Sequence, residues 1–159
     1  MNLYFRLFLI FIRTLRKKHI PIDDLANSVS VRVLPNDLDL NMHVNNGRYL
    51  TFCDLTRVDL FIRSGLASLM IKNKWNPIIA EHSMEYIRPL NLFDKVEVSM
   101  KITHWDEKFF YCTHEFHKDE KLIAKGTSRA LVISKQGSLS PEFILQEVDT
   151  YQMQKNPQR

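Results

Sequence analysis

Six side chains able to act as an acid, a base or an amide crowd into the thirteen residues from 37 to 49. They are Asp37, Asp39, Asn41, His43, Asn45 and Asn46, and Gly47 and Tyr49 complete the segment. A carboxylate can deprotonate water or attack a carbonyl carbon, and neighbouring amide or imidazole groups can hold either partner in position. The segment therefore predicts acyl-transfer chemistry. Asp39 is the expected base or nucleophile, and Asn41 and His43 would orient the water or the carboxylate.

Each of these residues also has a simpler structural role open to it. An Asp ahead of a helix commonly binds backbone N–H groups, Asn45 and Asn46 are ordinary cap residues, and a lone His in a loop is usually exposed. A cap needs only one such group, so six of them in one segment favour catalysis. Asp37 and Tyr49 are expected to support the loop.

The segment leads into a helix that we expect from about residue 45 to 64. No proline occurs there, and apolar side chains recur so densely that the helix should be buried on most sides. Asn45 or Asn46 can cap its start, and Gly65 can end it. The first N–H groups of a helix lack intrahelical partners and carry partial positive charge. Amides near Asn46 and Gly47 are therefore expected to bind an oxyanion, and Gly47 has no side chain to block it.

The rest of the chain has the pattern of strands. Alternating Val residues predict a strand over 28–35, a short helical turn is expected over 66–75, and period-two alternation follows Pro77. The later strands are expected around Ile79, over 82–87, 96–102 and 109–116, and over 122–133. Short polar loops favour antiparallel pairing, and one apolar face of the sheet needs a cover. We therefore expect an α+β fold in which a curved antiparallel sheet wraps around the long helix.

The composition is that of a globular protein and excludes disordered and collagen-like classes. With 159 residues, 45% hydrophobic and 25% charged, the chain is long enough for one domain with a proper core. Cys53 and Cys112 lie in apolar segments and are expected to be reduced and structural. The four glycines form no phosphate or dinucleotide loop, and the histidines on the predicted strands lack metal-ligand spacing, so we expect no cofactor and no metal.

The N-terminal segment, residues 1–20, has its own character. An apolar, aromatic run broken only by Arg6 precedes the basic residues of 13–18, and these residues account for most of the net charge of +4. The rest is near neutral, so nucleic acid is not an expected partner. As a helix the run would span about 15 to 18 Å, too short to cross a bilayer. It suits a membrane surface, or else packs on the domain or on a second subunit. Residues 21–151 would form the main domain and 152–159 a polar tail.

The segment D-L-D-L-N-M-H-V-N-N-G-R-Y resembles a motif of the hot-dog thioesterase superfamily, in particular the 4-hydroxybenzoyl-CoA thioesterase-like proteins, the small acyl-CoA thioesterases and the plant acyl carrier protein thioesterases. The resemblance extends over about residues 28–141. It implies a hot-dog fold, and it carries the catalytic roles of the motif onto Asp39, Asn41 and His43. A His of the bacterial enzymes falls at Asn46, which is therefore included among the catalytic candidates.

The chain departs from the plant pattern at one point. After a comparable strand segment the plant enzymes have a Glu-Cys pair in the active site, where this chain has Pro89 and Leu90. The simpler, Asp-centred hydrolysis of the bacterial enzymes therefore fits better. Glu81 and Glu85 are four residues apart, which places them on the same side of a strand, and both are expected to face solvent.

The resemblance implies an enzyme that hydrolyses acyl thioesters, with acyl-CoA as the expected substrate and acyl carrier protein as the alternative. It also implies a homodimer or homotetramer, whose partner subunit would complete the pocket. The expected location is the cytoplasm, with the N-terminal segment on the inner face of the membrane. Two other functions stay open at this stage: a hot-dog dehydratase, and an acyl-binding or membrane-associated protein without catalysis.

Overall fold

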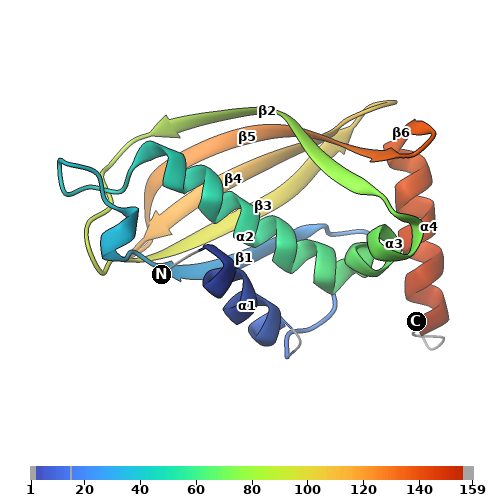
Figure 1. Ribbon diagram of the computed structural model, residues 1–159, viewed down its shortest axis with the longest axis horizontal. Helices are drawn as coiled ribbons and strands as arrows, with labels where there is room; N and C mark the ends of the chain where they lie inside the picture. The colour runs from blue at the N-terminus through green and yellow to red at the C-terminus, as the bar shows by residue number, and fades with distance from the viewer. Residues whose placement is uncertain (1–2, 15, 156–159) are drawn as a thin grey trace.

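A computed structural model describes residues 3–14 and 16–155 (Figure 1). Its elements, in chain order, are α1 (Leu3–Thr14), β1 (Ala26–Arg32), a short 3-10 helix (Pro35–Asp37), α2 (Asn46–Ser64), α3 (Leu66–Asn73), β2 (Asn76–Tyr86), β3 (Lys95–Trp105), β4 (Phe110–Lys118), β5 (Lys121–Ser134), β6 (Gly137–Leu139) and α4 (Pro141–Lys155). The strands form one antiparallel sheet in the order β1-β3-β4-β5-β2, with β6 paired to β5. The sheet curls around α2, which confirms the predicted hot-dog fold.

The central helix α2 begins and ends where the sequence predicts. The Asn45 side chain accepts a hydrogen bond from the Gly47 N–H at 2.9 Å, and Gly65 ends the helix with a φ of 87°, which a residue without a side chain adopts at little cost. Phe52 and Leu55 are fully buried against the sheet, where Phe116 of β4 meets them in the main core. Burial on this face is what fixes α2 across the sheet.

Several boundaries differ from the prediction. β1 ends at Arg32, before Pro35 starts the short helix, and β2 begins earlier than expected, at Asn76. The helix α4 was not predicted, and it includes Gln152, which we had placed in the polar tail. The Gln152 side chain is buried and donates to the carbonyl oxygens of Ile20 and Ser64, at 3.1 and 3.0 Å. Residues 156–159 of the expected tail lie outside the described residues.

The N-terminal helix α1 packs beside α2 and next to β1. Its inward side carries Arg6, Ile10 and Thr14, each four residues from the next and all buried. Thr14 donates a hydrogen bond to Asp59 of α2 at 2.8 Å. The alternative in which this segment packs on its own domain is therefore observed.

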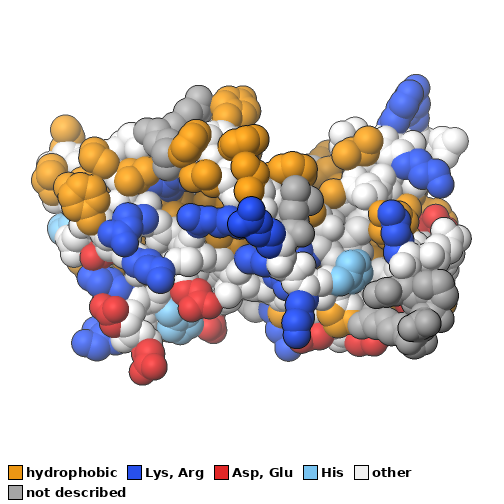
Figure 2. Space-filling model, turned by 90° about the horizontal axis from the view of Figure 1, so that it is seen from below, with side chains coloured by type: hydrophobic (Ala, Val, Ile, Leu, Met, Phe, Trp, Pro, Cys, Tyr) orange, Lys and Arg blue, Asp and Glu red, His pale blue; other side chains and the backbone are white. Residues whose placement is uncertain are grey.

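The outward side of α1 is apolar and exposed. It carries Tyr4, Phe5, Phe8, Phe11 and Ile12. Figure 2 shows hydrophobic side chains along this edge, with Lys and Arg side chains beside them. Among the described residues, no helix has both the length and the apolar character needed to cross a membrane.

Candidate active site

The turn between the short helix and α2 holds Asp39. One carboxylate oxygen, Oδ1, accepts hydrogen bonds from the N–H groups of Asn41 and His43, at 2.8 and 3.4 Å. The backbone of the turn is closed by the Asp39 N–H, which donates to the His43 carbonyl oxygen at 2.8 Å, and Met42 adopts a φ of 62°. Within the part of the chain that the structure describes, Oδ2 has no hydrogen-bond partner. The half-buried carboxylate is thus held by one oxygen and presents the other.

The turn brings Asp39, Asn41 and His43 together through the backbone rather than through their side chains. Asn41 and His43 are exposed. No hydrogen bond joins the Asp39 and His43 side chains among the described residues. Asn46 opens the first turn of α2 and is exposed as well, and its carbonyl oxygen accepts a hydrogen bond from Tyr86 of β2 at 3.2 Å.

The N-terminus of α2 differs from the prediction in one respect. The Gly47 N–H, expected to bind an oxyanion, is already bonded to the cap residue Asn45. A Cβ on Gly47 would lie 3.2 Å from the Asn45 Oδ1, so the glycine permits the close approach of the cap. Of the two amides expected to face substrate, only the Asn46 N–H has no hydrogen-bond acceptor within residues 3–14 and 16–155.

Asp37 has a structural position, as expected. Its carboxylate is fully buried and accepts hydrogen bonds from Arg6 of α1 and from the Leu34 N–H at 2.9 Å. Arg48 of α2 donates from Nε at 2.9 Å and from Nη2 at 2.8 Å. The Asp37 carbonyl oxygen accepts from the Asn45 N–H at 2.8 Å. Asp37 therefore joins α1 and α2 to both ends of the turn.

Tyr49, the other expected support, is also buried. Its ring lies 5.0 Å from that of Tyr86 and 5.2 Å from that of Phe116. Burial raises the pKa of Tyr49 to about 12, although a backbone hydrogen bond at Leu90 opposes that rise. The tyrosine stays protonated and serves as packing under the first turn of α2.

A cavity of about 310 Å³ lies further along α2. Its walls are almost wholly apolar and come from all four α-helices and the sheet, with Asp54, Arg57 and Ser64 as polar groups in the lining. Asp54 lies about 12 Å beyond Asn46 along the helix axis, taking 1.5 Å per residue. The volume lies at the lower end of the range of small-molecule pockets.

Comparisons with known proteins identify the family. The family model of the thioesterase-like superfamily matches residues 33–148. The chain belongs to the thioesterase-like superfamily. Protein THEM6 of Xenopus laevis is 36% identical over 124 residues, which are 77% of this chain and 58% of that protein. The chain thus spans little more than half the length of this curated relative.

Solved structures of thioesterases have the same fold. The probable thioesterase YbaW of Escherichia coli superposes with a TM-score of 0.70 at 22% identity, covering 76% of this chain and 94% of the other. The gentisyl-coenzyme A thioesterase BH1999 superposes with a TM-score of 0.69 at 21% identity, covering 77% and 99%. At these identities the likeness shows the fold alone.

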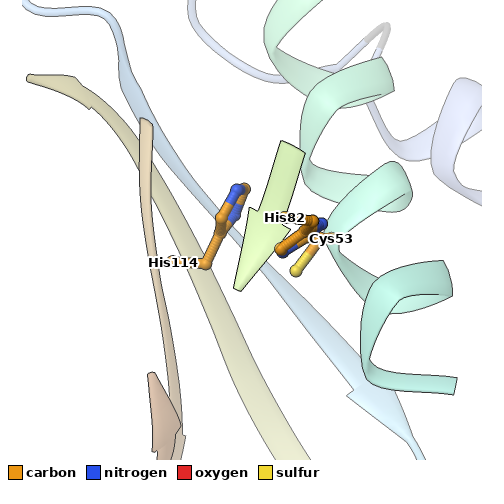
Figure 3. Close-up of side chains that lie close together, drawn as sticks. All are labelled: Cys53, His82 and His114. Atoms are coloured by element: carbon orange, nitrogen blue, oxygen red, sulfur yellow. The ribbon is translucent and has the colours of Figure 1, made fainter. Parts of the chain in front are cut away.

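A second polar cluster of this thioesterase-like domain lies between α2 and the sheet. Cys53 of α2, His82 of β2 and His114 of β4 converge from three elements (Figure 3), and one ligand atom of each lies within 4.8 Å of the others. The two imidazole rings stack with their centroids 5.2 Å apart. The spacing in the sequence could not reveal this cluster, because its members meet only through the fold.

The surroundings of the cluster do not suit a metal ion. The Arg57 Nη2 lies 3.3 Å from His82 Nδ1 and 3.5 Å from His114 Nε2, and Ser128 Oγ lies 2.9 Å from the same Nε2. A guanidinium only donates, so these ring nitrogens accept, and the opposite nitrogens carry the protons. Burial, with Arg57 and His82 adding to it, lowers the pKa of His114 to about 3, and burial raises that of Cys53 to about 12. The histidines are neutral, but Arg57 occupies one nitrogen of each ring and the Cys53 thiol stays protonated, so the guanidinium cation and the thiol both disfavour a metal ion.

Sequence reasoning missed two contacts of the site, those of Arg6 and Arg48 with Asp37. Arg6 lies 31 residues from Asp37, so no local pattern links them. One signal existed: Arg6 is the single charge within an apolar run and falls in the helical repeat of Ile10 and Thr14. A charge on the inward face of a helix calls for a buried partner.

Proposed function

We propose that this domain hydrolyses acyl thioesters to a free acid and a thiol, with Asp39 as the central residue. The observation that carries the proposal is the half-buried Asp39 carboxylate, fixed through Oδ1 by two backbone N–H groups and open at Oδ2, beside the start of a long helix. Membership of the thioesterase-like superfamily supports it.

Two chemical routes use this arrangement. In one, Oδ2 removes a proton from water as the water attacks the thioester carbon; in the other, Oδ2 attacks the carbon itself and water cleaves the resulting anhydride. In both, the carbonyl oxygen becomes an oxyanion that the Asn46 N–H and the start of α2 would stabilise. The C–S bond then breaks, and the thiolate takes up a proton. The exposed side chains of Asn41 and His43 would orient the water.

We propose acyl-CoA as the substrate class. One structural neighbour is named as a thioesterase for gentisyl-coenzyme A, and another was solved in complex with CoA, which supports a CoA thioester over an acyl carrier protein. The acyl chain would lie along α2 toward the apolar cavity that starts at Asp54.

We also propose that a second copy of the chain completes the site. Asn41, His43 and Asn46 are exposed, so the site is open to solvent on one side. Strand β2 is a free edge of the sheet in the single chain, and Ile78, Ile79 and Tyr86 on it are exposed. An exposed apolar edge favours pairing with another strand. Analytical ultracentrifugation should therefore give a dimer or a higher oligomer, and a monomer at assay concentration would contradict this proposal.

The outer face of α1 is proposed to rest on the cytoplasmic surface of a membrane. Its aromatic residues can enter the headgroup region, and the exposed Arg13, Arg16 and Lys18 can face anionic lipid. Flotation with phosphatidylcholine vesicles, with and without phosphatidylglycerol, tests this. The double variant Phe5→Ser/Phe8→Ser should float less than wild type, while Ile71→Ser, which removes a still more exposed apolar side chain from α3, should float like wild type. Equal flotation of all three would contradict the proposal.

A thiol-release assay over acyl-CoAs of increasing chain length tests the hydrolysis itself. Asp39→Ala should lower turnover by about 100-fold or more, because the group that activates water is gone. Asp23→Ala, an exposed aspartate elsewhere, is the matched control and should keep wild-type turnover.

Two outcomes would favour the other functions. Enoyl product without free thiol from a 3-hydroxyacyl-CoA would indicate a dehydratase. Acyl-CoA binding without turnover, unchanged in Asp39→Ala, would indicate a binding protein.

A further inference from the structure

Arg6 reaches from α1 into the interior of the domain. Its side chain is 4% exposed, and its Nη2 donates to the Asp37 carboxylate and, at 3.2 Å, to the carbonyl oxygen of Arg32 at the end of β1. The guanidinium carbon also lies 5.1 Å from the centre of the Phe52 ring. The Arg6 side chain of α1 thus contacts β1, α2 and Asp37, which lies two residues before Asp39.

Asp37 is the base of that turn. The chain leaves Asp37, forms the turn, and returns at Asn45, whose N–H donates to the Asp37 carbonyl oxygen at 2.8 Å. Leu38 and Val44, the next residues inward, pair as an isolated bridge. Any displacement of Asp37 therefore moves both ends of the turn at once, and with them Asp39 and the cap residue of α2.

Two cations hold the Asp37 carboxylate from opposite elements. Oδ1 takes Arg48 of α2, and Oδ2 takes Arg6 of α1. Arg48 is itself in the first turn of α2, so it moves with the site, whereas Arg6 ties the site to a separate helix. Without Arg6, a fully buried carboxylate would keep one cation, and the turn would lose its contact with α1.

We propose that Arg6 is a positioning residue of the thioesterase site, so that α1, the helix with the exposed apolar face, holds the Asp39 turn in place through Asp37. The inference rests on the proposed function of Asp39. Arg6 touches no reacting group and acts only through Asp37. A carboxylate displaced by about 1 Å from its productive position can cost up to about 100-fold in rate.

The test compares Arg6→Gln and Arg6→Lys with Thr14→Val, a matched control. Thr14→Val removes the buried hydrogen bond from α1 to Asp59. Asp59 lies more than three helical turns beyond Asn46 along α2. For each variant we would measure kcat and KM for acyl-CoA, the melting temperature, and hydrogen exchange of the peptide spanning residues 34–47 by mass spectrometry.

Arg6→Gln should lower kcat by about tenfold or more, with KM within about twofold, and should speed exchange in the peptide 34–47. Arg6→Lys keeps the charge and should be intermediate in both measurements. Thr14→Val should lower the melting temperature but keep wild-type kcat and exchange of that peptide. If Arg6→Gln does not fold, Arg6→Lys carries the test through the same two measurements.

Three results would overturn the proposal: a kcat for the folded Arg6 variants within twofold of wild type, an equal loss of kcat in Thr14→Val, or unchanged exchange of the peptide 34–47. Failure of the proposed function is distinguishable, because it would show as an Asp39→Ala protein that keeps its turnover. Faster exchange of the turn in Arg6→Gln is measured without any substrate, so it reports on positioning alone.

Discussion

Replacing each aspartate of the Asp37-Leu38-Asp39 stretch by asparagine should have a different effect: Asp37→Asn should lower stability, and Asp39→Asn should remove activity. Asp37 is fully buried between Arg6, itself 4% exposed, and Arg48. Asp37→Asn leaves Arg6 buried without its counter-charge. Breaking a buried pair from one side costs about 3 to 5 kcal/mol, and the lower end applies because the amide oxygen still accepts one hydrogen bond. For a domain of this size about 3 kcal/mol lowers the melting temperature by about 6 to 12 °C.

Asp39→Asn should leave stability almost unchanged and remove activity. The amide oxygen can still accept from the Asn41 and His43 N–H groups, so the turn survives and the melting temperature should stay within about 2 °C. The amide has no charge with which to deprotonate water or attack the thioester, so kcat/KM should fall by about 100-fold or more.

Thermal melts by circular dichroism and thiol release, run on both variants and on wild type, separate the two effects. The reasoning is refuted if Asp37→Asn melts within 2 °C of wild type, or if Asp39→Asn loses stability as Asp37→Asn does. Stable, active Asp39→Asn protein would remove Asp39 from the mechanism.

Three further predictions follow from other parts of the structure. Burial holds the pKa of His114 at about 3, whereas an unfolded histidine titrates near 6.5, so the unfolded chain binds the extra proton. The free energy of unfolding should therefore decrease as the pH is lowered from 6.5 to 3, by up to about 1.4 kcal/mol for each pH unit. His114→Gln should flatten that slope in urea titrations, and an unchanged slope would contradict the burial argument. Gly65→Ala should lose about 2 kcal/mol, because φ is 87° and the new Cβ would lie 2.5 Å from the Tyr151 ring; a wild-type melting temperature would argue against this. Zn²⁺ should leave the melting temperature within about 1 °C, since Arg57 occupies the histidines, and a rise that Cys53→Ser abolishes would show that a metal displaces it.

The elements that follow local rules were predictable from the sequence. The cap at Asn45 and the stop at Gly65 predicted the bounds of α2, and period-two alternation located β3, β4 and β5. The helix α4 was missed, since no element was predicted for residues 141–151 of the domain and residues 152–155 were placed in the polar tail, although Ile144 and Val148 keep a helical spacing.

The candidate site was predictable only in part. The dense segment 37–49 pointed to Asp39 because its neighbours in the turn are also its neighbours in sequence. The pairing of Asp37 with Arg6 and the meeting of His82 with His114 depend on how α1 and the sheet fold back, and no local pattern encodes them. The hydrogen bond from the Gly47 N–H to the Asn45 side chain was not predicted either, because Asn45 and Asn46 both qualified as the cap residue.

The buried contacts of α1 bear on how the protein can be shortened. An apolar, aromatic leading helix is a common target for removal when a better-behaved fragment is wanted. Here that cut would take Arg6 from Asp37 and both Thr14 and Lys17 from Asp59, two carboxylates with no exposed surface. A fragment starting near residue 20 would keep Arg48 on Asp37 and Arg63 on Asp59, but both buried carboxylates would lose their contacts with the N-terminal segment, and one of them lies directly beneath the Asp39 turn. Poor yield or inactivity of such a fragment would reflect these lost contacts, and would not count against the proposed hydrolysis.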